Sequence, residues 1–237
     1  MPILMYHKLG PRPRGVRQKG LYVSTELFSR QMAELRAAGF APLPLSDLAM
    51  AKRNPHPIVI TFDDGCENVL RHGTACLRDN GFYALQFLVA HRLGQTNDWD
   101  AAAGEVAERL MNPSQVREWL AAGNEIGSHT LTHPWLTRLS LAQAREEIVA
   151  SKRSLEDTFG MPIRHFCYPY GNMNQAVRDL VAEAGYTTAC TTEPGMNTSE
   201  TDPFRLKRFT ARYPSRNLKA MWTRWRAALF PQAVPAG

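Results

Sequence analysis

The chain has 237 residues, of which 44% are apolar, so it is long enough to bury one sizeable core in a single domain. Its net charge of +6 and pI near 9.3 favour an anionic neighbour, such as a phospholipid surface, a phosphorylated lipid carrier or an acidic glycan. The charge excess is modest, and the basic clusters at 12–19 and 205–226 match no nucleic-acid motif, so we expect no nucleic-acid partner.

Short apolar runs alternate with segments of helical period along most of the chain, a pattern that predicts βαβ units and a parallel sheet. Ser24 and Ser140 can cap two of the helices, and five glycines fall just past predicted helix ends: Gly39, Gly81, Gly123, Gly160 and Gly185. The predicted strands are 3–6, 58–62, 84–90, 124–127, 165–168 and 186–189, and the predicted helices are 25–38, 68–79, 113–122, 141–159 and 175–184.

Two adjacent carboxylates, Asp63 and Asp64, end the apolar run 58–60. Burying a carboxylate is costly unless a metal, a cation or hydrogen bonds compensate it, so the pair is a candidate active site. A strand that ends in an Asx turn, with Gly65 at positive φ, explains the same residues equally well. The Asp pair alone therefore leaves both interpretations open.

His129 and His133 follow another strand-like segment, 124–127. Histidines four apart face the same side of a helical turn, so both imidazoles can reach one metal ion. An Asp oxygen from a neighbouring strand end would complete three protein ligands and leave positions for water and substrate. A lone His-x-x-x-His pair usually indicates solvated side chains, but together with the Asp pair it predicts a catalytic metal site.

The alternation fades beyond residue 197, although the basic segment 205–209 could form a last strand. The stretch 217–230 combines aromatic and basic residues, which is typical of a helix on an anionic membrane surface; packing over the end of the barrel is the commoner role for a terminal helix. We therefore divide the chain into a domain at 1–212 and a C-terminal amphipathic helix and tail at 213–237.

The cysteines form no C-x-x-C pair, so we expect four reduced thiols: Cys66, Cys76, Cys167 and Cys190. Residues 1–10 lack the basic and apolar regions of a secretory signal, and no window approaches eighteen consecutive apolar residues. A cytoplasmic protein, peripheral to the inner membrane, is the expectation, although a trimmed leader would leave the same sequence.

Three blocks, in order, resemble the metal-dependent polysaccharide deacetylases of carbohydrate esterase family four, also called the NodB homology domain. They are Thr-Phe-Asp-Asp-Gly at 61–65, His-Thr-Leu-Thr-His at 129–133 and Tyr-Pro-Tyr-Gly at 168–171. The opening Leu-Met-Tyr-His at 4–7 resembles the circularly permuted branch that contains poly-N-acetylglucosamine deacetylases, where the catalytic histidine comes first. The resemblance covers about residues 1–210 and implies a single-domain α/β fold, a distorted (β/α)7-type barrel.

The resemblance also implies a role for each residue of these blocks. Asp63 would be the general base, His7 the general acid, and the backbone N–H of Tyr170 would help hold the tetrahedral oxyanion. A divalent metal, usually Zn²⁺ with Co²⁺, Ni²⁺ or Mn²⁺ as alternatives, would be bound by Asp64, His129 and His133.

One block departs from the family pattern, because the third motif usually begins with an arginine that pairs with the base, and this chain has Phe166 and Cys167 there. Arg208 is a candidate to replace that arginine as the donor to the base. An equally good interpretation is that Arg208 forms a salt bridge on the surface. Substrate contacts are assigned to this arginine and to three further residues: Trp135, Trp99 and Asp100.

These residues predict a metal-dependent hydrolase that removes an N-acyl group, most often N-acetyl, from an amino sugar. The expected substrate is an N-acetylated polysaccharide or a lipid-linked sugar, such as a lipopolysaccharide-type intermediate made at an anionic membrane. Two alternatives stay open. One is an amidohydrolase of small cyclic imides or ureides on the same fold. The other is a non-catalytic glycan-binding module, which would follow if the missing arginine had ended catalysis.

Overall fold

The structure, a computed structural model, describes residues 1–47 and 56–211. The strands are β1 (Ile3–Tyr6), β2 (Lys8–Leu9), β3 (Tyr22–Val23), β4 (Ala41–Pro42), β5 (Pro57–Phe62), β6 (Leu85–Leu88), β7 (Glu125–Ser128), β8 (His165–Cys167), β9 (Thr188–Cys190) and β10 (Phe209–Thr210). The α-helices are α1 (Thr25–Ala37), α2 (Glu67–Asp79), α3 (Pro113–Ala121), α4 (Leu141–Phe159) and α5 (Gln175–Glu183). Short 3-10 helices are η1 (Lys19–Leu21), η3 (Ala90–Arg92), η4 (Asp98–Ala103), η5 (Leu136–Arg138) and η6 (Pro169–Gly171).

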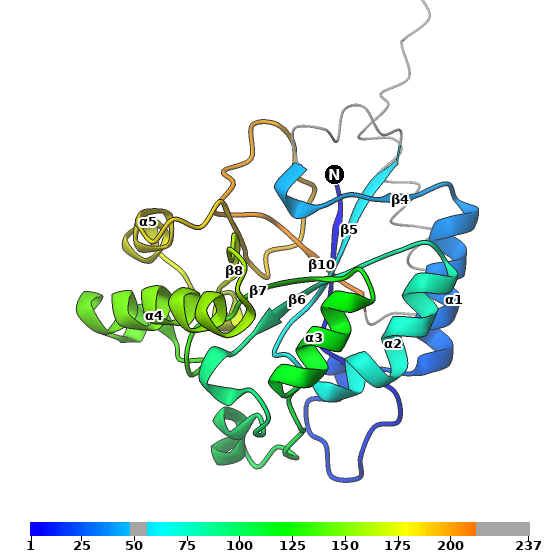
Figure 1. The fold of residues 1–237 in the computed structure, drawn as a ribbon, viewed down its shortest axis with the longest axis horizontal. Helices are drawn as coiled ribbons and strands as arrows, with labels where there is room; N and C mark the ends of the chain where they lie inside the picture. Colours follow the sequence, from blue (N-terminus) through cyan, green and yellow to red (C-terminus); the bar gives the residue numbers. More distant parts are fainter. Residues whose placement is uncertain (48–55, 212–237) are drawn as a thin grey trace, which may run out of the picture.

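The main sheet curls into a distorted barrel, with α1, α2 and α3 on one side of Figure 1 and α4 and α5 on the other. Its strands follow the order β10, β1, β5, β6, β7, β8, β9, all paired in parallel, and β4 pairs with β5. Leu206 joins the two ends, because its N–H donates to Ala189 and its carbonyl accepts from Thr191, both at 2.9 Å, just before β10 pairs with β1. The predicted (β/α)7-type barrel is confirmed.

Local sequence signals place the helices within about a residue of where they lie. The Ser24 hydroxyl accepts the N–H of Leu27 at the start of α1, and Ser140 accepts that of Gln143 at the start of α4. The five glycines predicted to end helices all have φ between 67° and 84°, the left-handed region that glycine enters without a steric penalty.

The packing of β5 fixes the end of the strand that carries the Asp pair. Phe62 is fully buried, and its ring lies 5.3 Å from that of Tyr6, 5.7 Å from Phe28 and 6.2 Å from Trp119. Because Phe62 directly precedes Asp63, this aromatic cluster holds the point from which the carboxylate projects.

The parallel pairing of β2 with β3 was not predicted. It folds residues 10–21 over the carboxyl end of the barrel, where they meet the segment 94–111 at the lower edge of Figure 1. The Glu105 carboxylate accepts the N–H of Gln18 at 2.7 Å and of Arg17 at 3.2 Å, so it ties the two segments together. They form one border of the site.

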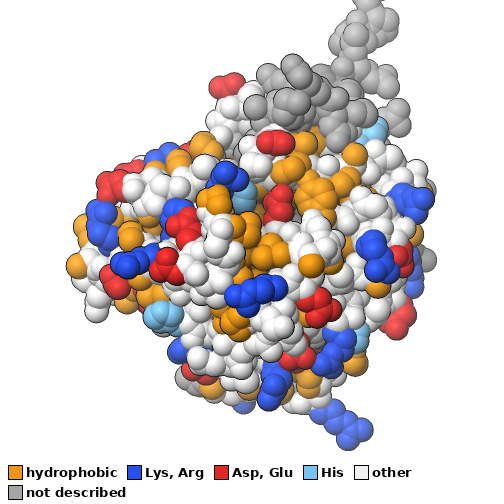
Figure 2. Space-filling view, viewed as in Figure 1, with side chains coloured by type: hydrophobic (Ala, Val, Ile, Leu, Met, Phe, Trp, Pro, Cys, Tyr) orange, Lys and Arg blue, Asp and Glu red, His pale blue; other side chains and the backbone are white. Residues whose placement is uncertain are grey.

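Charged side chains of both signs surround apolar side chains near the centre of the face in Figure 2. Among the described residues, no helix combines the length and apolar character needed to span a membrane. All four cysteines are free thiols, as expected. The predicted amphipathic helix, with the rest of 213–237, lies outside the described residues.

Candidate active site

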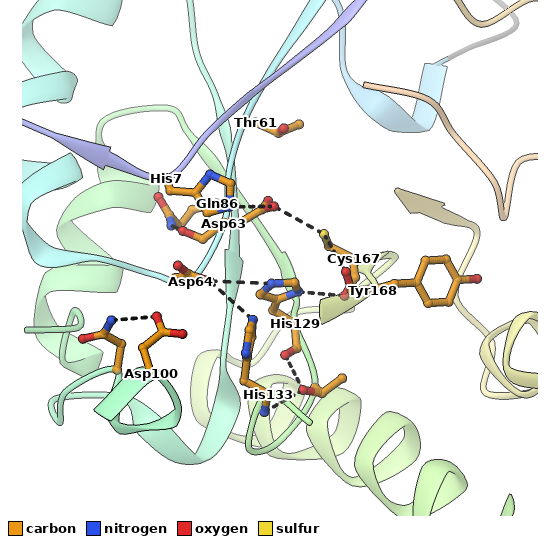
Figure 3. A network of polar contacts seen from close by, with 12 residues as sticks. His7, Thr61, Asp63, Asp64, Gln86, Asp100, His129, His133, Cys167 and Tyr168 are labelled. Atoms are coloured by element: carbon orange, nitrogen blue, oxygen red, sulfur yellow. Dashed lines mark hydrogen bonds and ion pairs between the residues drawn. The ribbon is translucent and has the colours of Figure 1, made fainter. Parts of the chain in front are cut away.

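Asp63 and Asp64 follow β5 directly and are 2% and 4% exposed. Adjacent residues on extended backbone point to opposite sides of a strand, but Asp64 has φ of 74° and Gly65 has φ of 80°. The chain therefore kinks, and both carboxylates lie near His129 in Figure 3. A left-handed residue other than glycine costs about 1–3 kcal/mol and is concentrated at functional sites. The positive φ of Gly65 agrees with the turn that the sequence allowed, and Asp64 adds a second left-handed residue to it.

Arg208 forms a bidentate ion pair with Asp63, at 2.7 Å from Nη1 to Oδ1 and 2.8 Å from Nη2 to Oδ2. The arginine has no exposed surface, and it also donates to the carbonyl of Thr191 at 2.8 Å and to the hydroxyl of Thr61 at 3.1 Å. It reaches Asp63 from the segment that closes the barrel. Arg208 thus lies where a replacement for the missing arginine is needed, and its complete burial places it behind the carboxylate and away from a sugar.

The charge of Arg208 decides the ionisation of Asp63. Burial alone would raise the pKa of Asp63, but the paired guanidinium outweighs it and holds that pKa below its ordinary value. Cys167 packs against both partners, with Sγ 3.0 Å from Nη2 of Arg208 and 3.7 Å from Oδ2 of Asp63. Asp63 is therefore a carboxylate at neutral pH, which is the form a general base requires.

His7 is the last residue of the Leu-Met-Tyr-His block at 4–7, and its Nε2 lies 3.7 Å from Oδ2 of Asp63. Burial lowers the pKa of His7 to about 4, although Asp63 opposes the shift, so the imidazole is neutral at neutral pH. The amide of Gln86, on β6, donates to the backbone carbonyl of Asp63 at 3.1 Å. The first block of the chain and the Asp pair thus meet in space.

Asp64, His129 and His133 form a buried set of three possible metal ligands. Oδ1 of Asp64 lies 3.7 Å from Nε2 of His129 and 3.6 Å from Nε2 of His133. The other nitrogen of His129, Nδ1, lies 2.7 Å from the carbonyl of Cys167 and so carries the proton, which leaves the Nε2 lone pair facing Asp64. Burial raises the pKa of Asp64 to about 7, and a cation would favour its ionised form. This donor set fits a divalent ion such as Zn²⁺.

The two histidines do not lie on a helical turn, contrary to the prediction. They belong to an irregular loop in which Thr130 and His133 have φ of 71° and 68°. The Glu147 carboxylate of α4 organises the loop by accepting the N–H groups of Leu131 at 2.9 Å and Thr132 at 3.0 Å. The imidazoles meet because the loop closes around this carboxylate, a contact that residue spacing does not reveal.

Aromatic rings enclose His133. Trp99 stacks on its imidazole with centroids 4.5 Å apart, and Tyr170 contacts it edge-on at 4.6 Å. Trp135 stacks on Tyr170 at 4.2 Å, and the Arg138 guanidinium lies 4.5 Å from the centre of the Trp135 ring. A tyrosine ring and a guanidinium cannot share one face, so both faces of Trp135 are covered. Trp99 and Trp135 therefore line the site, but only the edge of Trp135 is left for a sugar.

Tyr170 and Gly171 form a strained turn after β8, with φ of 59° and 69°. Tyr170 is 38% exposed, and burial raises its pKa to about 12, so its phenol stays protonated. Tyr168, which begins the same block, points away from the site in Figure 3 and donates to the carbonyl of Phe204 at 3.0 Å. Only the second tyrosine of the block borders the site.

Gly171→Ala is expected to destabilise the fold by about 1–3 kcal/mol and to slow catalysis, because the left-handed φ is unfavourable for alanine. A Cβ at this position would also lie 2.0 Å from Oγ1 of Thr192. Thermal unfolding and kinetics test this. Gly160→Ala is the matched control, since Gly160 has φ of 67° with no atom within 4 Å of a built Cβ. If both variants lost the same stability, the predicted clash with Thr192 would be contradicted.

Three residues that border the site were not predicted: Lys8, Gln86 and Glu147. Lys8 is fully buried, and its Nζ has no hydrogen-bond partner among the described residues. The sequence did hold a signal for Lys8, because a charged residue closely follows the apolar segment that begins the chain. Asp100, which was predicted, is 8% exposed, accepts from the Asn97 amide at 3.3 Å and is drawn below Asp64 in Figure 3.

Asp and His side chains gathered at the carboxyl ends of the strands of a parallel barrel form a candidate site for metal-assisted hydrolysis. The chain belongs to the polysaccharide deacetylase family, since the family model described as polysaccharide deacetylase matches residues 51–189.

Individual relatives agree with this assignment. YxkH of Bacillus subtilis, named provisionally as a polysaccharide deacetylase, is 26% identical over 213 residues, 88% of this chain and 70% of that protein. A chitooligosaccharide deacetylase of a Bradyrhizobium species is 30% identical over 129 residues, 54% of this chain and 52% of its own length. The structure of IcaB from Ammonifex degensii shares the fold, with a TM-score of 0.79 at 23% identity over 93% of this chain and 95% of that one.

Proposed function

We propose that this protein is a metal-dependent hydrolase that releases acetate from an N-acetylated amino sugar in a glycan. The observation that carries the proposal is an ionised Asp63, held by Arg208, next to the buried set of Asp64, His129 and His133. The named relatives support the glycan class, since they include deacetylases of chitooligosaccharide and of peptidoglycan N-acetylglucosamine. The non-catalytic alternative depended on the missing arginine of the third motif, and Arg208 supplies a guanidinium to Asp63 in its place.

Asp64, His129 and His133 would hold the divalent ion, which when bound polarises the amide carbonyl and makes a water molecule more acidic. Asp63 takes a proton from the water that attacks the carbonyl carbon. The backbone N–H of Tyr170 stabilises the charge that develops on the carbonyl oxygen.

His7 delivers a proton to the leaving nitrogen as the carbon–nitrogen bond breaks. Because His7 starts neutral, it must first gain a proton, and Oδ2 of Asp63 lies 3.7 Å from its Nε2. We therefore infer that the proton taken up by Asp63 is the one that His7 passes on. The products are acetate and a free amine on the sugar.

Chelation is expected to abolish acetate release, and Zn²⁺, Co²⁺, Ni²⁺ or Mn²⁺ is expected to restore it. His133→Ala should bind the ion at least about tenfold more weakly, because it removes one of three ligands. Metal content after dialysis measures this independently of activity. The exposed His91→Ala is the control and should retain the ion. Full activity of a chelated, metal-free wild type would contradict the proposal.

We further propose that the glycan is lipid-linked, as in a lipopolysaccharide-type intermediate, and that the enzyme acts on the cytoplasmic side as a peripheral membrane protein. The net charge of +6 supports contact with anionic lipid. Acetate release should be compared on chitooligosaccharide, poly-N-acetylglucosamine, peptidoglycan, lipid-linked N-acetyl sugars and cyclic ureides, with liposome flotation alongside. Exclusive activity on soluble oligosaccharides, without flotation, would overturn this part, and exclusive cleavage of ureides would overturn the deacetylase assignment.

A further inference from the structure

Arg138 is an exposed arginine whose guanidinium is held in place by stacking. It lies 4.5 Å from the centre of the Trp135 ring, and among the described residues its side chain donates no hydrogen bond and forms no ion pair. Within 1–47 and 56–211, three other arginines also lie over aromatic rings, but each of these donates to a protein oxygen: Arg117 to Thr158, Arg178 to Asp202 and Arg208 to Asp63. Among the described residues, Arg138 is thus the stacked arginine whose side-chain N–H groups have no protein acceptor.

A continuous row of ring contacts, two stacked and one edge-on, connects this guanidinium to the candidate metal site. Successive contacts of 4.5, 4.2 and 4.6 Å run from Arg138 to Trp135, from Trp135 to Tyr170 and from Tyr170 to His133. Trp135 and Tyr170 are 37% and 38% exposed, so the edge of the stack faces solvent. The guanidinium therefore lies at the far end of a partly exposed row of contacts that begins at the candidate metal site.

The loops that carry the stack are joined, which fixes its geometry. Thr137, next to Arg138 in η5, donates both its N–H at 3.0 Å and its hydroxyl at 2.8 Å to Oδ1 of Asn172. Asn172 directly follows η6, which carries Tyr170. Stacking on an aromatic face leaves the in-plane N–H groups of an arginine free for two parallel hydrogen bonds to a planar or tetrahedral anion.

We propose that Arg138 binds an anionic group, a phosphate or a carboxylate, carried by the glycan near the sugar that loses its acetyl group. This inference rests on the proposed function and specifies its substrate as an anionic glycan. The phosphate could belong to a lipid diphosphate linkage and the carboxylate to an acidic sugar; both offer oxygens to the same donors. Arg138 acts here in specificity, outside the chemical step.

The test compares wild type and Arg138→Met on three matched N-acetylated oligosaccharides that are neutral, phosphorylated or carboxylated. The variant is expected to lose about tenfold in kcat/KM on the charged substrate, chiefly through KM, and to stay within about twofold on the neutral one. The preference of the wild type should weaken as ionic strength rises. The charged substrate that shows the loss identifies the source of the anion. Arg117→Met, which also removes a stacked arginine, should change none of these values.

Binding separates this proposal from the deacetylase assignment. Calorimetry with Asp63→Asn and with Asp63→Asn/Arg138→Met measures glycan affinity without turnover. Tighter binding of an anionic glycan that disappears in the double variant supports the role of Arg138 even if the wild type releases no acetate. Equal affinities for neutral and anionic glycans, or equal kinetics of wild type and Arg138→Met on all substrates, would overturn it.

Discussion

Asp63→Asn is expected to lower kcat for acetate release by about 10²- to 10⁴-fold, the usual contribution of a general base. The amide has nearly the shape of the carboxylate but cannot take a proton at neutral pH. The metal content should not change, because Asp63 is outside the set of Asp64, His129 and His133. Acetate release and metal content, measured on the same preparation, give the two results together.

The same substitution leaves the buried Arg208 without its anion, so a fall in stability of about 3–5 kcal/mol is expected as well. Activity must therefore be measured well below the melting temperature of the variant. Asp157→Asn is the control, because Asp157 pairs with Arg153 at 3.6 Å on the exposed face of α4 and should matter little to stability or rate. If folded, metal-loaded Asp63→Asn released acetate at the rate of the wild type, Asp63 would not be the base.

The elements that sequence predicted are those whose signals are local. The apolar run of β5, the cap at Ser24 and the glycines after the helices each depend on neighbours within one turn or strand. In contrast, β2, β3 and β4 have only two residues each, too few for a periodic pattern. They are fixed by partners elsewhere in the chain, so they became visible only in three dimensions.

Within the site, residue types in the sequence predicted the candidate metal ligands, but not the contacts that hold these ligands in place. The positive φ of Gly65 was expected, whereas that of Asp64 was not, because aspartate is not a residue type that signals a left-handed backbone as strongly as glycine does. The loop of His129 and His133 depends on Glu147, which is fourteen positions beyond His133 on α4. Arg208 was named as a replacement donor for Asp63, with a surface salt bridge as the alternative, and closure of the barrel decides between the two because 145 positions separate the partners.

Arg208→Met is expected to destabilise the protein by about 3–5 kcal/mol, because it leaves the Asp63 carboxylate buried without its cation. It should also reduce acetate release at neutral pH, since burial would then raise the pKa of Asp63 without opposition and protonate part of the base. Urea unfolding and kinetics measure the two effects. Arg178→Met is the matched control: Arg178 also makes a bidentate pair, with Asp202 at 2.9 and 3.0 Å, but at a partly exposed position, so a loss below about 1 kcal/mol is expected.

The pH dependence has a definite sign. In the wild type the pKa of Asp63 is lower in the folded than in the unfolded state, so the pair stabilises the fold above about pH 4 and its contribution is lost only as the pH falls further. In Arg208→Met the pKa of Asp63 is raised instead, so the acid limb of kcat/KM should move to higher pH and stability should fall as the pH rises through the new value. An unchanged acid limb, with stability lost by the same amount at every pH, would mean that Arg208 supports the barrel without tuning the base.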